Sequence, residues 1–155
     1  QKYPHQVGLN MARSLVYQKA GNTPAAEADL RLVLTREPDN VDALNALGYL
    51  LADSNRQLDE AKKLLERALA LQPQDPAILD SMGWLMFRMG QKEEALLRLK
   101  KSFAMHPNDE VAAHLGEVLW LTGQPIEAKK IWEQGLKLKP NSEAISTVRQ
   151  RLQAQ

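Results

Sequence analysis

The residues of this chain that could do chemistry are its histidines and its paired carboxylates. His5, His106 and His114 lack the i, i+4 spacing of a metal site, and the chain has no cysteine. Glu93 and Glu94 fall where a helix is expected to begin, and the helix dipole favours acidic residues there. No glycine-rich phosphate loop and no nucleophile elbow occurs. We therefore predict a protein that is not an enzyme and needs no metal or cofactor.

Three lysine pairs raise the question of nucleic-acid binding. They are Lys62-Lys63, Lys100-Lys101 and Lys129-Lys130. Acidic residues such as Glu66 and Glu133 stand within one helical turn of them, and no aromatic residue is interleaved to stack on bases. The chain has 20 basic and 19 acidic residues, so its net charge of +1 gives little attraction to nucleic acid or an anionic membrane. A solvated outer face is the better interpretation.

The length and composition of the chain fit one globular domain over residues 1–155. A hydrophobic content of 44% is enough for a packed core. No apolar run approaches the ~18–20 residues of a membrane span, so this chain should not insert directly into a membrane. The absence of cysteine leaves the cellular compartment undecided.

An internal repeat of 33–35 residues organises the whole sequence. Its prolines stand at Pro38, Pro73, Pro107 and Pro140. A small-residue step follows about ten residues after each of the first three: Leu47-Gly48, Met82-Gly83 and Leu115-Gly116. An alanine comes twelve or thirteen residues after each glycine: Ala61, Ala95 and Ala128. The first copy matches the pattern less closely but keeps its spacing, with Ser14 in the glycine position.

Each copy predicts a helical hairpin. In the third copy, Asp75-Pro76 is typical of a helix start, Gly90 of a left-handed helix end, and His106-Pro107 of a second stop. Glycine inside a helix is unfavourable, so a glycine shared by three copies indicates that the paired helix crosses closely there. The predicted repeats are 7–40, 41–75, 76–108 and 109–141. A helix over 142–153 should seal the end of the stack with Ile145, Val148 and Leu152.

The Leu-Gly step, the alanine and the closing proline resemble the tetratricopeptide repeat family, over about Val7 to Pro140. The resemblance implies an all-α fold: a right-handed superhelical solenoid of helix-turn-helix hairpins with a C-terminal capping helix. The function it implies is a non-catalytic scaffold or adaptor that binds a protein or peptide partner.

In such a solenoid the first helix of each hairpin lines the concave side. The positions expected to face the groove supply the candidate binding residues Asn45, Tyr49, Asp53, Asp80, Trp84, Phe87, Arg88, Glu117 and Trp120. One interpretation is an exposed aromatic strip, with Trp84 and Trp120 as anchors, Tyr49 beside Trp84, and Phe87 beside Trp120. The alternative is that these rings pack between adjacent repeats. A clamp for a terminal carboxylate is disfavoured, because Asn45 has no cation beside it and Asp80 stands where one would be needed.

The amino-acid sequence of the second to fourth copies resembles the C-terminal part of tetratricopeptide outer-membrane lipoproteins of proteobacteria. The segments concerned are DALNALGYLLAD, DPAILDSMGWLMFRMG and EVAAHLGEVLWLTG, and the resemblance spans about Asp39 to Pro140. It implies an adaptor for a periplasmic carboxyl-terminal processing protease and its substrates. It also implies a periplasmic location, tethered to the outer membrane through a longer parent chain; a cytoplasmic location is the alternative.

A second functional hypothesis comes from the N-terminal end of the chain. Met11 and Leu15 are apolar residues that have no predicted neighbour, so this end could self-associate. The chain would then be a self-assembling structural segment of a larger tetratricopeptide repeat protein.

Overall fold

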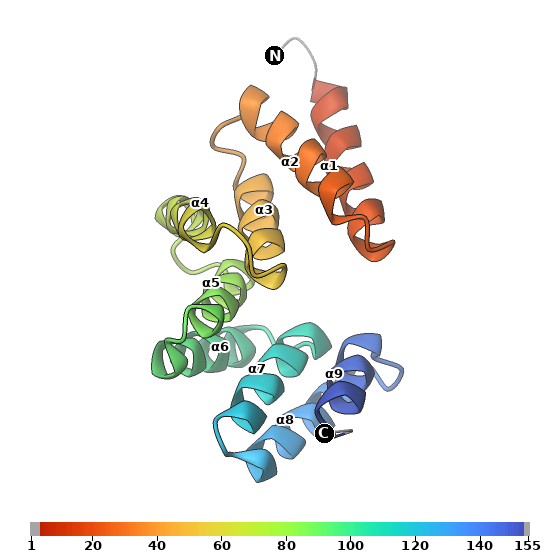
Figure 1. The fold of residues 1–155 in the computed structure, drawn as a ribbon, viewed down its shortest axis with the longest axis vertical. Helices are drawn as coiled ribbons and strands as arrows, with labels where there is room; N and C mark the ends of the chain where they lie inside the picture. The colour runs from red at the N-terminus through yellow and green to blue at the C-terminus, as the bar shows by residue number, and fades with distance from the viewer. Residues whose placement is uncertain (1–3, 154–155) are drawn as a thin grey trace.

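The computed structural model describes residues 4–153, with side chains from Gln6 onward, so the His5 side chain lies outside the described part. Nine α-helices and no strand occur in this range (Figure 1). They are α1 (Pro4–Lys19), α2 (Thr23–Arg36), α3 (Val41–Asp53), α4 (Leu58–Leu71), α5 (Pro76–Arg88), α6 (Lys92–Met105), α7 (Asp109–Leu121), α8 (Pro125–Leu138) and α9 (Glu143–Gln153). The predicted all-α repeat solenoid is confirmed.

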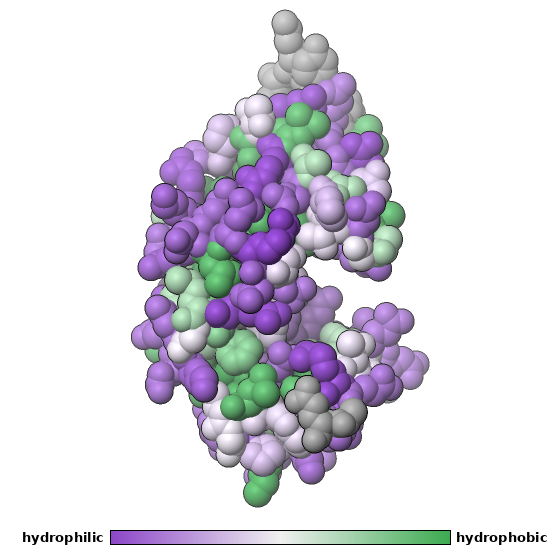
Figure 2. Space-filling view, in the orientation of Figure 1, coloured by the Kyte–Doolittle hydropathy of each residue, from purple (hydrophilic) through white to green (hydrophobic). Residues whose placement is uncertain are grey.

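The helices pack as four consecutive hairpins, α1–α2, α3–α4, α5–α6 and α7–α8. Each second helix also packs on the first helix of the next hairpin, and α3, α5, α7 and α9 follow one another in contact. The stack bends into an open arc (Figure 1), and the space-filling view shows a notch between the α1–α2 end and α9 (Figure 2). The first helices α3, α5 and α7 therefore form one continuous layer, which we call the inner face.

The local signals for the helix ends act as the sequence predicts. The Asp75 carboxylate accepts the backbone N–H groups of Ala77 and Ile78 at 2.8 and 3.4 Å, and Pro76 is the first residue of α5. Gly90 has a φ of +81°, a left-handed conformation that lets the chain leave α5 and turn into α6.

The predicted close crossing of the paired helices is also confirmed. A Cβ atom at Gly83 would lie 2.8 Å from Cγ of Leu99 and 3.3 Å from the carbonyl oxygen of Ala95, both on α6. Gly48 and Gly116 face Leu65 and Trp132 in the same way. Glycine is needed at this position because the partner helix occupies the space of any larger side chain.

The end of the stack is sealed by α9. Its buried residues are Ile145, Val148 and Leu152, as predicted. The Ser142 hydroxyl oxygen accepts the backbone N–H of Ile145 at 3.2 Å and so caps the helix. The outward side of α9 is polar.

Candidate protein-binding face

His114 lies at the centre of a cluster that joins three first helices. Its Nδ1 lies 2.9 Å from Oδ1 of Asp80 on α5, and its Nε2 lies 3.0 Å from the hydroxyl oxygen of Tyr49 on α3. In a neutral ring that donates from Nδ1 to the carboxylate, Nε2 accepts the Tyr49 O–H. Protonation makes Nε2 a donor, and the Tyr49 oxygen then accepts. The ring thus holds α3, α5 and α7 together in either state.

Trp84 is the largest member of this cluster and is almost fully buried. The imidazole of His114 stacks on it, with 4.6 Å between ring centroids and 24° between ring planes. The Arg88 guanidinium lies 5.0 Å from the centroid of the Trp84 ring, and the indole N–H donates to the Asp53 carboxylate at 3.2 Å. Only 3% of Trp84 is exposed. The expectation that Trp84 is an exposed anchor is therefore wrong, because neighbouring helices cover the ring.

The electrostatics of the cluster favour a charged His114. Burial is the largest single influence and opposes the charged imidazole, but the carboxylate of Asp80 together with those of Asp53 and Glu117 outweighs it, so the pKa of His114 is raised. Burial, together with the carboxylates of Asp53 and Asp80, raises the pKa of Tyr49. The phenol therefore stays protonated and can donate or accept a hydrogen bond but does not act as a base.

Glu117 does not face the groove either. Only 3% of it is exposed, and its carboxylate forms an ion pair with Arg151 of α9. The C-terminal helix covers this position, so the prediction that Glu117 is an accessible groove residue is wrong. Glu117 instead fixes α9 to α7.

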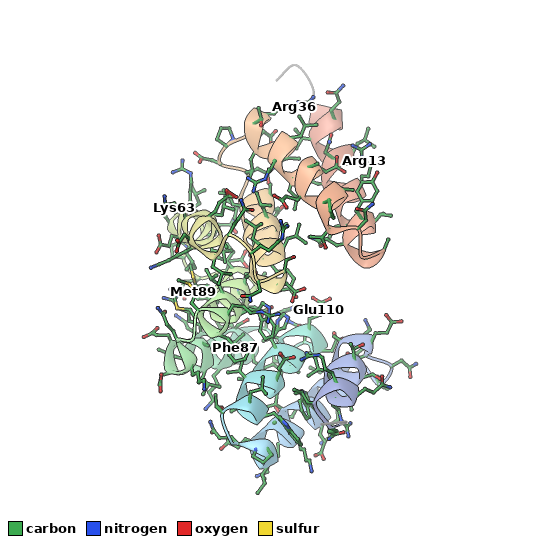
Figure 3. The ribbon with its side chains drawn as sticks, viewed as in Figure 1. Arg13, Arg36, Lys63, Phe87, Met89 and Glu110 are labelled. Atoms are coloured by element: carbon green, nitrogen blue, oxygen red, sulfur yellow. The ribbon has the colours of Figure 1, made fainter. Side chains whose placement is uncertain are left out.

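Phe87 and Trp120 do not form a shared aromatic row. The Phe87 ring packs on Trp84, with 5.4 Å between centroids, and the Trp120 ring packs on Trp132 of its own hairpin, with 5.8 Å. Both residues are half-buried. Figure 3 shows Phe87 near the end of α5 and Glu110 at the start of α7, beside the notch. These two ring contacts lie within one helix and within one hairpin, so they are not the packing between adjacent repeats that the alternative interpretation expected; of the candidate aromatic residues, Tyr49 and Trp84 do contact a neighbouring repeat, through His114.

The remaining candidates keep part of their surface accessible. The side chains of Asp53 and Arg88 are 51% and 30% exposed, and Arg88 donates to the Asp53 carbonyl at 3.1 Å. Asn45 is half-buried, and its Oδ1 has no hydrogen-bond partner. The structure thus gathers Tyr49, Asp53, Asp80, Trp84, Phe87 and Arg88 in one cluster.

Sequence reasoning missed His114 as the residue that connects the cluster. It stands two residues before the glycine of its copy, a position that holds Ala12, Ala46 and Ser81 in the other three. A large polar ring where the other copies have small residues is the signal that could have identified it.

The described residues form neither a metal-binding cluster nor a membrane-spanning helix. Within residues 4–153, no group of three or more His, Cys, Asp or Glu side chains is arranged to hold a metal ion. Among the described helices, none combines the length and apolar character that crossing a membrane requires.

Comparison with known proteins identifies the family. The tetratricopeptide repeat family model matches residues 9–114. The chain is 47% identical over 116 residues to the TPR repeat-containing protein PA4667 of Pseudomonas aeruginosa, covering 75% of this chain and 20% of that protein. It is 27% identical over 135 residues to the type IV pilus assembly protein PilF of the same organism, covering 85% of this chain and 53% of that protein.

A solved structure agrees with this fold. The thermophilic TPR protein TTC0263 of Thermus thermophilus superimposes with a TM-score of 0.81 at 18% identity, covering 99% of this chain and 82% of that one. The chain spans only a fifth to about half the length of the two Pseudomonas aeruginosa relatives. With the family match over two thirds of its length, this chain belongs to the tetratricopeptide repeat family.

Proposed function

We propose that this chain is a non-catalytic scaffold, an adaptor that binds a protein or peptide partner along its inner face. Tetratricopeptide repeat domains generally mediate protein–protein interactions. The observation that carries the proposal is that α3, α5 and α7 present polar side chains on one continuous layer, among them the exposed Asp53 and Glu110 and the half-buried Asn45. The notch visible in Figure 2 supports access of a partner to this layer.

The charge on the inner face indicates the chemistry of the bound segment. Together α3, α5 and α7 carry six carboxylates and one arginine. Four of the carboxylates have a cationic partner: Asp53 has Arg88, Asp80 has His114, Asp109 has Lys139 and Glu117 has Arg151. Asp42 and Glu110 remain exposed. A partner segment with lysine or arginine side chains would complement this surface.

Asn45 supports a polar rather than an apolar mode of recognition. Its Oδ1 is an acceptor without a partner, and buried acceptors are normally satisfied. A rotation of this side chain toward a bound segment would let it accept a backbone N–H. With Trp84 buried, hydrogen bonds and charge are better supported than an aromatic strip as the source of specificity.

For the identity of the partner we propose a periplasmic carboxyl-terminal processing protease and its substrates. The resemblance of residues from about Asp39 to Pro140 to outer-membrane lipoproteins supports it. The relative PilF, which is named for type IV pilus assembly, adds to this support. The same support applies to a periplasmic location with an outer-membrane tether on a longer parent chain.

The proposal is tested by capturing partners from a periplasmic extract on the immobilised chain. An inner-face variant, Asn45→Arg/Glu110→Arg, should lose the captured partner. A matched outer-face variant, Glu66→Arg/Gln134→Arg, makes the same change in charge on second helices and should keep it. Thermal unfolding of both variants would check that they are folded. Equal capture by the inner-face variant and the unaltered chain would contradict the proposal.

A further inference from the structure

We propose that the outward face of α1 is a repeat-stacking interface. It would be occupied by a tetratricopeptide hairpin that precedes it in the same polypeptide, with the second helix of that hairpin packed on Leu9 and Val16. The inference concerns an end of the solenoid and is independent of what binds the inner face.

The apolar surface of α1 is unusually exposed. Leu9 and Val16 are 68% and 64% exposed. Leu9 and Val16 border a shallow hollow of about 520 Å³, whose other lining residues are Gln6, Asn10, Ala12 and Arg13. Large aliphatic side chains grouped in this way on one helix indicate a surface that is normally covered.

The other three hairpins show what covers this surface. Leu9 stands five residues before the glycine position of its copy, and its equivalents are Ala43, Ile78 and Val111, which are 0%, 1% and 3% exposed. Val16 stands two residues after that position, and its equivalents are Leu50, Leu85 and Val118, which are 7%, 0% and 0% exposed. Both positions are therefore buried in every repeat that has a predecessor.

The covering element in those repeats is the second helix of the preceding hairpin. The helix pairs α2–α3, α4–α5 and α6–α7 are in contact. Around Ile78, the buried cluster includes Ala68, with Leu64 and Leu69 packed against it, all from α4. The exposed face of α1 is the surface of the first hairpin that is equivalent to the faces of α3, α5 and α7 covered by α2, α4 and α6. The occupant it fits is an amphipathic helix with the apolar stripe of a second helix.

The opposite end of the solenoid is built differently. On α9 the exposed residues are polar or charged, among them Ser146, Thr147 and Gln150. A terminal repeat needs such a polar outer face because no neighbour covers it. The α1 end lacks such a polar outer face. The α1–α2 hairpin itself is well held together, for example by the ion pair between Arg13 (labelled in Figure 3) and Asp29 of α2.

Related chains leave room for a preceding hairpin in the same polypeptide. PA4667 of Pseudomonas aeruginosa shares 47% identity with this chain, which covers only 20% of that protein. A hairpin supplied by the same polypeptide needs no association between molecules, and this favours it over a second copy.

A chimera tests the inference directly. A second copy of residues 76–108 takes the place of residues 1–6, directly before Val7. The added copy of α6 then meets α1 as the native α6 meets α7. We expect the chimera to melt at least roughly 4 °C above the unextended chain, because new apolar surface is buried. Leu9→Lys/Val16→Lys should remove this gain, while changing the melting temperature of the unextended chain little.

A control pair separates this interface from a general effect of charge. Leu97→Lys/Ile126→Lys replaces two aliphatic residues that are 65% and 72% exposed on second helices, and it should leave the gain intact. A chimera without the gain, or a gain that survives Leu9→Lys/Val16→Lys, would overturn the inference. Sedimentation of the unextended chain at two concentrations checks the competing occupant. A dimer that Leu9→Lys/Val16→Lys dissociates would assign the face to a second copy instead.

Discussion

The imidazole of His114 on α7 stacks on the indole of Trp84 on α5, with their centroids 4.6 Å apart. The same imidazole reaches Tyr49 on α3 through its other side. One side chain therefore joins three consecutive repeats across the inner face. In a solenoid, where each repeat mostly contacts its neighbours, such a residue couples the stability of the repeats as well as shaping the groove.

Replacement of Trp84 should mainly lower stability. Trp84→Ala removes a ring that is 3% exposed and leaves the Asp53 carboxylate without the indole donor. We expect a loss of about 3–5 kcal/mol in the free energy of unfolding, measured by urea titration. Trp120→Ala is the control, and its half-buried ring should give a smaller loss. A Trp84→Ala protein as stable as the unaltered chain would show that the ring does not pack between repeats.

The stability of the chain should depend on pH through His114. Burial lowers its pKa, but the attraction of Asp80, Asp53 and Glu117 together outweighs burial and raises the pKa in the folded state, so the folded state binds the proton more tightly than the unfolded chain does. This contribution is fully present below about pH 6.5, the ordinary histidine value, and is lost as the pH rises through the folded-state pKa.

The measurement is the melting temperature between about pH 5.5 and 9, compared with that of His114→Gln. The unaltered chain should lose melting temperature on the alkaline side relative to the variant. His106→Gln changes an exposed histidine and should follow the unaltered chain. Parallel profiles for the unaltered chain and His114→Gln would contradict a raised pKa.

Gly83→Val should be destabilising, because a Cβ atom at Gly83 would lie 2.8 Å from Cγ of Leu99. We expect a loss on the order of 1–3 kcal/mol in the free energy of unfolding, measured by thermal or urea unfolding. Gly8→Val is the matched control on α1, because a Cβ atom there meets nothing within 4 Å. Equal midpoints for the Gly83→Val protein and the unaltered chain would mean that the helices can separate at no cost.

The fold could be predicted from the sequence because its signals are local and repeated. The glycine position, the Asp75 cap and the apolar side of α9 each follow from the periodicity of one or two helices. The candidate site could not be predicted in the same way. Whether Trp84 is exposed depends on the His114 side chain of the next hairpin, and whether Glu117 is exposed depends on Arg151 of α9. These are contacts between repeats, and the positions that a repeat pattern assigns to a groove do not specify which neighbouring side chain fills it.

Gln57 offers a prediction in which the chain should gain stability. The turn between α3 and α4 holds one residue more than the turn of the next hairpin, and it closes with two left-handed residues that are not glycine, Asn55 at φ +52° and Gln57 at φ +48°. A left-handed conformation is unfavourable for a residue with a Cβ atom by roughly 1–2 kcal/mol, and asparagine tolerates it better than glutamine. The Gln57 side chain makes no capping hydrogen bond and is exposed, so its removal takes away no contact of this kind. Gln57→Gly should therefore raise the free energy of unfolding by about 0.5–1 kcal/mol, after the entropy of glycine in the unfolded chain is subtracted.

Asn55→Gly should give a smaller gain in the same urea titration. A loss of stability in Gln57→Gly would show that the unfolded-state entropy outweighs the strain of this turn.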